Sequence, residues 1–349
     1  MPCYATPTPT TILFISLFVL GTSYHLENDI TGRKFYEAFV FENIPDPTHG
    51  RVDYVDKATA IAHNLTFATD DAFVLKSDDK EVLNPYGPGR KSVRLRSVET
   101  HTNMLLVFDI RHMPQGCGTW PAVWTVGPNW PHGGEIDIVE GVNNQSPNSA
   151  VLHTAPGCTM PTRRNQLGTA IHSDCNALVN WNSGCGVRFP TAGSYGPPFN
   201  NNGGGWYAME RSSTHIKVWF WPSNGRVPSE VQSGSHRADP DSWGPPTAYF
   251  PNTRCDIDRY FAAQFIVINL TFCGDWAGNT YAQSRCPGTC VDYVNNNPDA
   301  FENAYFHFAS LKIYKPHRHE TATPAQSKST GGLHLFKQLF QLTAQPLRK

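Results

Sequence analysis

The sequence predicts an all-β protein built as a two-sheet sandwich or jelly roll. The chain has 349 residues, of which 28 are glycine and 28 are proline, and aromatic residues reach 12% while charged residues are only 16%. No long stretch between residues 35 and 311 has the hydrophobic period of a helix. The same region contains many short runs of β-branched and aromatic residues, bounded by turn formers, without a βαβ alternation.

The N-terminus predicts a secretion signal. Residues 12–21 form a short apolar run, and small residues at 21–23 precede a cleavage position before Tyr24. This run is shorter than a membrane-spanning helix requires. Residues 1–11 contain no Lys or Arg, so a disordered start or a signal anchor remains the alternative. We expect a signal peptide at 1–23 and a folded domain at 24–316.

The predicted strands follow one another along this domain. Glycine-rich loops such as residues 200–205 connect them. Examples of the many expected strands are Ser92–Leu95, Leu105–Asp109, Glu135–Val139, Ala150–His153, Trp206–Arg211, His215–Trp221, Gln264–Asn269 and Ala304–Tyr314. Residues 317–349 predict a polar, basic and disordered tail, in which a short amphipathic segment at 334–342 leaves a membrane-surface helix as the alternative.

Charge and cysteine content restrict the class of protein. A formal net charge of -1 gives no reason to expect a nucleic acid or an anionic membrane as partner. Without Cys3, which lies in the predicted signal, eight cysteines remain, and an even number suits disulfides in an oxidising compartment. The spacing of Cys286 and Cys290 also suits a metal knuckle, but no second close pair completes a tetrahedral site. The sequence leaves the pairing open. Asn64, Asn144 and Asn269 begin glycosylation triplets, each of them weak evidence alone.

The most informative segment is Glu135-Ile-Asp-Ile-Val-Glu140, which has three carboxylates among β-branched residues. In a regular strand Glu135 and Asp137 share one face, whereas Glu140 lies an odd number of residues from Glu135 and faces the other side. An unpaired carboxylate buried in a core costs several kcal/mol. A β-bulge, which is one extra residue in the strand, returns Glu140 to the face of the other two acids. The segment therefore predicts a bulge, or it has no functional meaning.

With the bulge, the three acids form a site that suits a retaining glycosidase, in which two carboxyl groups lie about 5–5.5 Å apart. One of them is ionised and the other protonated, because crowded like charges make the second proton harder to remove. Asp137, between Glu135 and Glu140, shares a proton or forms a hydrogen bond with the nucleophile. For the hexapeptide alone, an acidic edge strand or a Ca²⁺ site is the alternative.

Tryptophans surround these acids in the sequence. Sugar rings stack their apolar C–H faces on indoles, so aromatic residues near carboxylates fit a glycan-binding site, although any one of them also fits a core. Trp130 lies in a Pro/Gly loop five residues before Glu135 and is the best candidate. His153 lies on the next predicted strand, where antiparallel pairing places it beside the acids, although a lone histidine is usually structural. The other tryptophans are Trp120, Trp124, Trp206, Trp219, Trp221, Trp243 and Trp276.

These residues resemble glycoside hydrolase family 16. The hexapeptide resembles the active-site signature of that family in its bulged form, and the flanking blocks resemble fungal laminarinase-like endo-1,3(4)-β-glucanases. The blocks extend over about residues 35–315, nearly the whole predicted domain. They are Asp46–Gly50, Gly89–Val93, Cys117–Pro128, Val151–Thr154, Trp206–Glu210 and Cys273–Gly278.

The resemblance implies a β-jelly roll with a substrate cleft on its concave face and hydrolysis of β-1,3 or mixed-linkage β-1,3-1,4 glucan with retention. It makes Glu135 the nucleophile, Glu140 the general acid/base and Asp137 the assisting carboxylate. It implies no catalytic cofactor, and we see no ligand cluster for the structural Ca²⁺ of some relatives. The implied substrate-binding residues are Trp130, His153, Trp276, Trp124 and Glu210.

Residues 24–316 are then the catalytic domain of a secreted, disulfide-bonded glycoprotein that we expect to be a monomer with β-glucan as its partner. One departure from the family pattern is Arg211, where relatives usually have Trp, and this change affects packing or a subsite. Two other functions remain possible. A non-catalytic glucan-binding protein would bind laminarin without releasing product, and a cell-wall transglycosylase would make longer products from short oligosaccharides.

Overall fold

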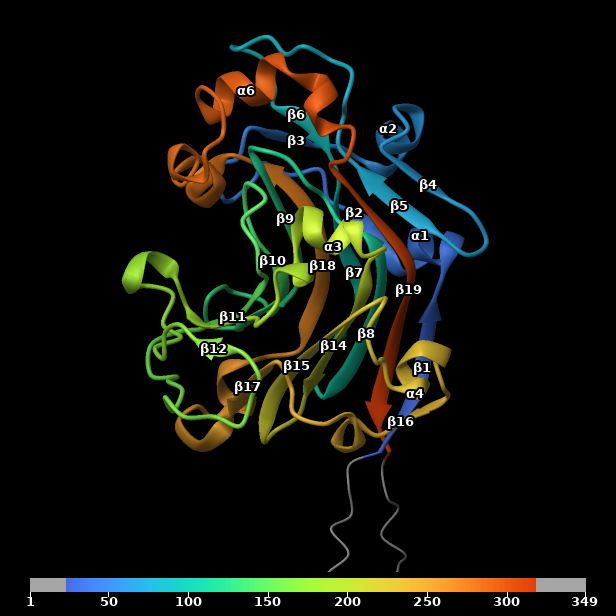
Figure 1. Cartoon of the computed structure of the whole chain (residues 1–349), viewed down its shortest axis with the longest axis vertical. Coiled ribbons are helices and arrows are strands. Elements are labelled where there is room, and N and C mark those ends of the chain that lie inside the picture. Colours follow the sequence, from blue (N-terminus) through green and yellow to red (C-terminus); the bar gives the residue numbers. More distant parts are fainter. Residues whose placement is uncertain (1–22, 318–349) are drawn as a thin grey trace, which may run out of the picture. The chain divides into compact units, whose positions relative to one another are not determined.

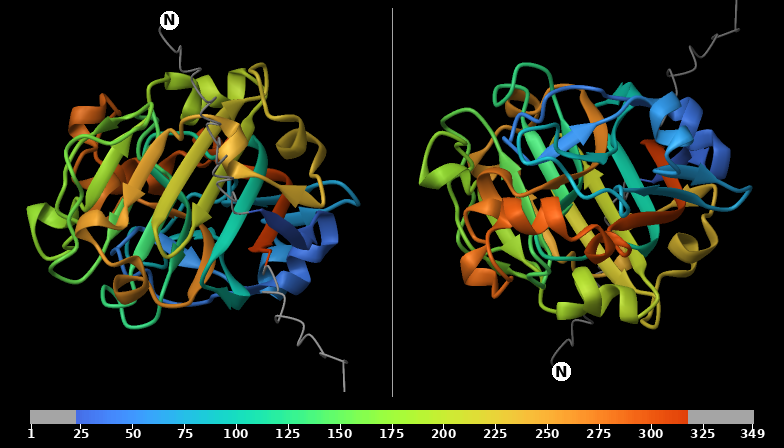
Figure 2. Two further views of the ribbon diagram at one scale, coloured as in Figure 1. Left: turned by 90° about the horizontal axis from the view of Figure 1, so that it is seen from below. Right: turned by 90° about the horizontal axis from the view of Figure 1, so that it is seen from above.

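The computed structural model describes residues 23–317. All but the first residue of the predicted tail and all but the last residue of the predicted signal peptide lie outside the described residues. Within this range the chain forms two large antiparallel sheets of nine and eight strands, a two-stranded sheet and several short helices. Figures 1 and 2 show the two large sheets stacked on each other. The prediction of an all-β sandwich of two antiparallel sheets is confirmed.

The nine-stranded sheet brings the two ends of the described chain together, because β1 pairs with β19. Its main path is β16-β1-β19-β8-β14-β15-β17, and β5 joins β19 and carries β4. The strands are β16 (Arg237–Ala238), β1 (Tyr24–Ile30), β19 (Tyr305–Pro316), β8 (Met104–His112), β14 (Gly205–Arg211), β15 (His215–Pro222), β17 (Ala248–Pro251), β5 (Phe73–Lys76) and β4 (Thr66–Ala68).

The eight-stranded sheet carries the acidic hexapeptide near its middle. Its order is β12-β13-β11-β10-β9-β18-β7-β2. The strands are β12 (Thr169–Ala170), β13 (Cys185–Arg188), β11 (Ser149–His153), β10 (Glu135–Glu140), β9 (Thr119–Val126), β18 (Gln264–Phe272), β7 (Arg94–His101) and β2 (Phe39–Phe41). Each strand given as an example from the sequence overlaps an observed one, and β1 and β9 are among the further strands in the structure.

The remaining elements are short. Strands β3 (Val52–Tyr54) and β6 (Arg90–Ser92) form the small parallel sheet, which lies near α6 at the top of Figure 1. The α-helices have four to seven residues, consistent with the absence of long helical periodicity in the sequence. They are α1 (Phe35–Ala38), α2 (Lys57–Ala62), α3 (Gly196–Asn201), α4 (Ser229–Ser233), α5 (Ile257–Tyr260) and α6 (Cys290–Asn296).

The main core lies between the two large sheets. Phe108 and Met209 come from the nine-stranded sheet, and Val123, Ile136 and Ile268 come from the eight-stranded sheet; all five are fully buried. Alternation along β9 and β10 directs these apolar residues inward and leaves the other face of the eight-stranded sheet for polar groups. We call this second face the open face, meaning the face turned away from the other large sheet.

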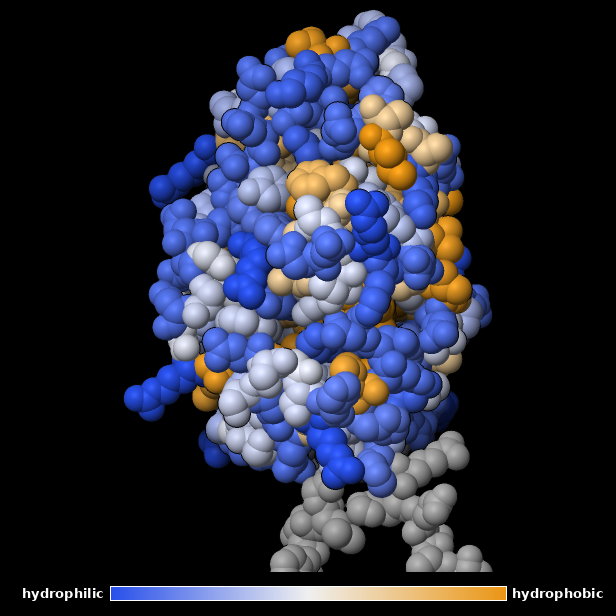
Figure 3. Space-filling view, turned by 90° about the vertical axis from the view of Figure 1, so that its right-hand side faces the viewer, coloured by the Kyte–Doolittle hydropathy of each residue, from blue (hydrophilic) through white to orange (hydrophobic). Residues whose placement is uncertain are grey.

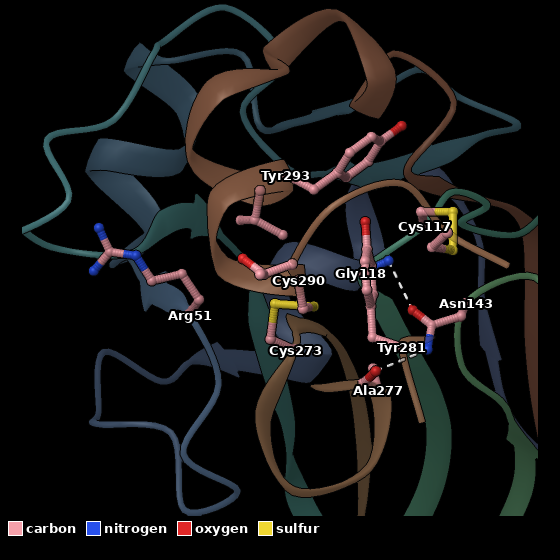
Figure 4. The surroundings of a disulfide bond; sticks show 12 residues. Arg51, Cys117, Gly118, Asn143, Cys273, Ala277, Tyr281, Cys290 and Tyr293 are labelled. Carbon is pink, nitrogen blue, oxygen red and sulfur yellow. Dashed lines mark hydrogen bonds between the residues drawn. A yellow bond between two sulfur atoms is a disulfide. The ribbon is translucent and has the colours of Figure 1, made fainter. Parts of the chain in front are cut away.

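Four disulfides connect the loops, which confirms that the eight cysteines pair and that Cys286 and Cys290 do not form a metal knuckle. The bonds are Cys117–Cys286, Cys158–Cys255, Cys175–Cys185 and Cys273–Cys290. Figure 4 shows two of them around Asn143, whose amide accepts from Gly118 N and donates to Ala277 O, both at 2.8 Å. This network fixes the segment Gly274–Gly278 against the start of β9.

The surface in Figure 3 is mostly hydrophilic with scattered hydrophobic side chains, as expected for a folded domain in water. Within residues 23–317, no helix is long and apolar enough to cross a bilayer.

Candidate active site

The bulge predicted from the hexapeptide is present in β10. Asp137 pairs with Trp124 of β9, but Val139 pairs with Val123, so Ile138 is the extra residue. Glu135, Asp137 and Glu140 are therefore opposite Val126, Trp124 and Ala122, which alternate with core residues and share one face of β9. All three acids lie on the open face, and the prediction of a bulge is confirmed.

A bulge interrupts the ladder and leaves backbone groups that need other partners. Asn148 supplies them from the turn before β11. Its Nδ2 donates to Ile138 O at 2.8 Å, and its Oδ1 accepts from Glu140 N at 2.9 Å. The Asn148 side chain is fully buried, and its own backbone N–H donates to Ser194 Oγ at 3.0 Å. Asn148 thus holds the bulge and fixes the backbone that carries Glu140, a role that the sequence did not reveal.

The three carboxyl groups have different environments. Asp137 is buried with an exposed fraction of 1%, and its pKa is raised well above the usual range by burial, by the charge of Glu135 and by a hydrogen bond with Glu135. Burial and the charge of Asp137 also raise the pKa of Glu140 well above its usual range, although the hydrogen bond from Trp120 opposes this rise. The site therefore favours the protonated form of Glu140 more than water does, as a proton donor requires.

Indole N–H groups orient both glutamates. Trp120 Nε1 donates to Glu140 Oε1 at 2.8 Å, and Trp130 Nε1 donates to Glu135 Oε2. Trp276 packs edge-on against Trp120 with a centroid distance of 5.7 Å. Trp130 therefore contacts Glu135, whereas Trp276 adjoins the site through Trp120, which contacts Glu140.

The β9–β18–β7 side of the acids combines aromatic and cationic groups. Trp124 Nε1 donates to Asn269 Oδ1 at 2.8 Å, and the Arg94 guanidinium lies 5.1 Å from the centre of the Trp124 ring. Arg94 and Arg96 both pair with Glu42, at 2.9 and 2.6 Å. These contacts hold the Trp124 ring on the open face next to Asp137, because Trp124 and Asp137 are opposite each other in the ladder.

His153 lies on the other side of the acids, opposite Glu135 in the β10–β11 ladder, as the sequence predicted. Its Nε2 is 3.3 Å from Asp137 Oδ2, and its Nδ1 is 2.9 Å from Asn182 Oδ1. Glu135, Asp137 and His153 present ligand atoms within 4.8 Å of one another, a spacing that suits a cation. The hydrogen bond between Asp137 and Glu135 also allows the two carboxyl groups to share a proton in this position.

Glu210 does not join this group, which corrects the expectation from the sequence. It lies on β14 in the nine-stranded sheet, on the face that Trp206 shares, away from the core between the sheets. Its carboxylate accepts from Tyr24 Oη at 3.0 Å and lies 2.9 Å from His215 Nε2 and 3.3 Å from Lys217 Nζ. These partners give Glu210 a structural role in a buried polar cluster.

Arg211 affects packing and does not reach the open face. Its side chain is buried and donates to Phe261 O and, at 2.7 Å, to Ala262 O. Ala262 N in turn donates to Gly133 O at 3.0 Å. Arg211 therefore supports Gly133, in the segment just before Glu135, indirectly: Arg211 binds Ala262, and Ala262 binds Gly133.

Comparison with known proteins places this site in context. Residues 39–314 match the family described as XgeA-like, catalytic GH16 domain. A probable glycosidase of Schizosaccharomyces pombe is 44% identical over 84% of this chain and 70% of its own length. A probable endo-1,3(4)-beta-glucanase of Aspergillus fumigatus is 42% identical over 88% of this chain, which spans only 48% of that relative.

Solved structures agree in fold. Laminarinase 16A of Phanerochaete chrysosporium, which was solved with 6-O-glucosyl-laminaritriose in donor and acceptor sites, is 56% identical with a TM-score of 0.83. An elongating GH family 16 beta-1,3-glucosyltransferase is 41% identical with a TM-score of 0.79. Each similarity covers 84% of this chain and all of the solved one.

Proposed function

The chain belongs to glycoside hydrolase family 16, and from this we propose that it is an endo-β-glucanase that hydrolyses β-1,3 or mixed-linkage β-1,3-1,4 glucan with retention. The observation that carries the proposal is the bulge at Ile138, which puts Glu135, Asp137 and Glu140 on one face. Relatives named endo-1,3(4)-beta-glucanase and laminarinase support the substrate class.

The proposed reaction has two steps. Ionised Glu135 attacks the anomeric carbon, while protonated Glu140 donates its proton to the departing glycosidic oxygen, and a glycosyl-enzyme forms. Glu140, now ionised, removes a proton from water, which attacks the same carbon and releases Glu135. The raised pKa of Glu140 supports its assignment as the acid.

Neighbouring groups prepare these steps. Asp137 lies against Glu135 and tunes it through the hydrogen bond between the two carboxyl groups, while Trp130 Nε1 orients the Glu135 carboxylate by donating to Oε2. The aromatic faces of Trp124 and Trp276 suit the apolar faces of glucosyl units beside the acids. His153 is placed to contact sugar hydroxyls next to Asp137.

We also propose that the protein is secreted and acts as a monomer without a cofactor. Four disulfides among the described residues and fungal glucanase relatives support an oxidising, extracellular compartment. A transglycosylase is the second candidate, because a solved structure 41% identical to this chain is an elongating beta-1,3-glucosyltransferase.

Product analysis on laminarin, lichenan and cellulose tests the proposal, with Glu135→Gln as the matched variant. We expect short oligosaccharides from laminarin, with or without lichenan, and none from Glu135→Gln. Products longer than a short oligosaccharide substrate would favour the transglycosylase. Binding of laminarin without any product would overturn the hydrolase and favour a non-catalytic glucan-binding protein.

A further inference from the structure

A loop beside the acids exposes a tryptophan for which the proposed reaction has no use. Residues 176–184 lie between Cys175 and Cys185, which form a disulfide. Trp181, in this loop, is 102% exposed, and no large hydrophobic side chain among residues 23–317 is more exposed. Tryptophan is normally buried for most of its surface, so a fully exposed indole is a candidate contact for a ligand.

The loop constrains the backbone at Trp181. Asn180, Trp181 and Asn182 all have left-handed backbone conformations, with φ of 52°, 56° and 57°. This conformation is unfavourable for a bulky residue and persists only where the surroundings impose it. The turn is closed by Asn182 N to Val179 O at 3.1 Å and Ser183 N to Asn180 O at 3.1 Å. The constrained backbone fixes where the side chain leaves the loop.

The loop is continuous with the site. Asn182 Oδ1 lies 2.9 Å from His153 Nδ1, and a Cβ on Gly184 would come within 2.9 Å of His153 Cε1. Trp181 is therefore on the β11–β13 side of the acids, opposite the side of Trp124. Adjacent strands are roughly 4.8 Å apart, so a position one or two strands from β10 is about one or two glucosyl units from the acids.

We propose that Trp181 is a stacking platform for a glucosyl unit of the bound glucan on the β11–β13 side of the acids. The inference rests on the proposed function, because a glucan that is cleaved between Glu135 and Glu140 must extend to both sides of them. The exposed indole suits the apolar face of a glucose ring, and the exposed amides of Asn180 and Asn182 suit its hydroxyls. Trp181 would then set the preference for long chains without taking part in bond cleavage.

The test compares Trp181→Ala and Trp181→Phe with Leu178→Ala. Leu178 lies on the same loop and is 72% exposed, so its truncation controls for a general change in loop hydrophobicity. kcat/KM and the pH profile are measured on laminari-oligosaccharides of increasing length. We expect Trp181→Ala to lower kcat/KM roughly 3- to 10-fold on long chains, mainly through KM, with a loss that shrinks as the chain shortens. Trp181→Phe should recover most of it, and Leu178→Ala should match the wild type.

Two results would overturn the proposal. If Trp181→Ala had wild-type kinetics on every chain length, Trp181 would not bind a glucosyl unit. An equal loss of kcat/KM on all chain lengths, with a shifted pH profile, would show that Trp181 acts through Asn182 and His153. Failure of the proposed function gives a different result, because the wild type itself would then release no product from any glucan.

Discussion

Replacement of Asn148 by Ala tests how the fold places the proton donor. The substitution removes both amide contacts with the bulge and leaves Ile138 O and Glu140 N without these partners in a buried region. An unsatisfied buried polar group costs about 1–3 kcal/mol, so the loss of both predicts a fall in the free energy of unfolding of roughly 2–6 kcal/mol. The backbone that carries Glu140 also loses its restraint.

Urea unfolding with the disulfides intact measures the stability, and kcat on laminarin measures the placement of Glu140. We expect a lower unfolding midpoint and a kcat about 100-fold lower under conditions where the variant is folded, because small displacements of a catalytic group have effects of this size. Gln145→Ala is the control, since this residue is exposed in the same turn and should change stability by about 0.5 kcal/mol or less. A stability and a kcat for Asn148→Ala that match those of the control would refute the reasoning.

Three further predictions follow from the same structure. Glu140→Gln should raise the free energy of unfolding at pH 7, because the fold raises the pKa of Glu140 and so disfavours its ionised form. Thermal melting should show this gain shrinking towards about pH 4, where the unfolded glutamate is also protonated. A gain that is independent of pH would contradict this prediction. Trp120→Phe removes a hydrogen bond that lowers the pKa of Glu140, so the basic limb of the pH profile of kcat should move to higher pH. A basic limb that stays at the same pH or moves to lower pH would count against Glu140 as the acid. After expression through a eukaryotic secretory pathway, peptide mass analysis should find a glycan on Asn64 and none on Asn269. Asn64 is exposed after α2, whereas Asn269 is buried and hydrogen-bonded to Trp124 and Tyr54. A glycan on Asn269 would be incompatible with the structure.

Much of the fold followed from local patterns in the sequence. The bulge was predictable because Glu135 and Glu140 have an odd spacing, and without an extra residue one of them would be buried unpaired. Strand β9 was less evident from the sequence, because Pro121 is near its start and proline normally disfavours an interior strand. Pro121 lies beyond the ladder with β10, which ends at Ala122, and is opposite only Leu270 of β18.

Other parts of the site depend on contacts that no local pattern reveals. Asn148 reaches the bulge across a turn, and Asn182 reaches His153 from a loop 29 residues away in sequence. Glu210 was misplaced for a different reason. It was carried over from the family resemblance alone, whereas its position on β14 depends on pairing with β8 and on buried partners from distant parts of the chain.

The most direct test of the account is to identify the residue that forms the covalent intermediate. The protein is incubated with a 2-deoxy-2-fluoro laminaribiosyl fluoride, whose electron-poor ring slows breakdown of the glycosyl-enzyme, and the modified peptide is sequenced by mass spectrometry. The account predicts a single adduct on Glu135, absent from Glu135→Gln and formed together with release of fluoride. An adduct on Glu140, or turnover of the fluoride with inversion at the anomeric carbon, would contradict the assignment of Glu135 as the nucleophile.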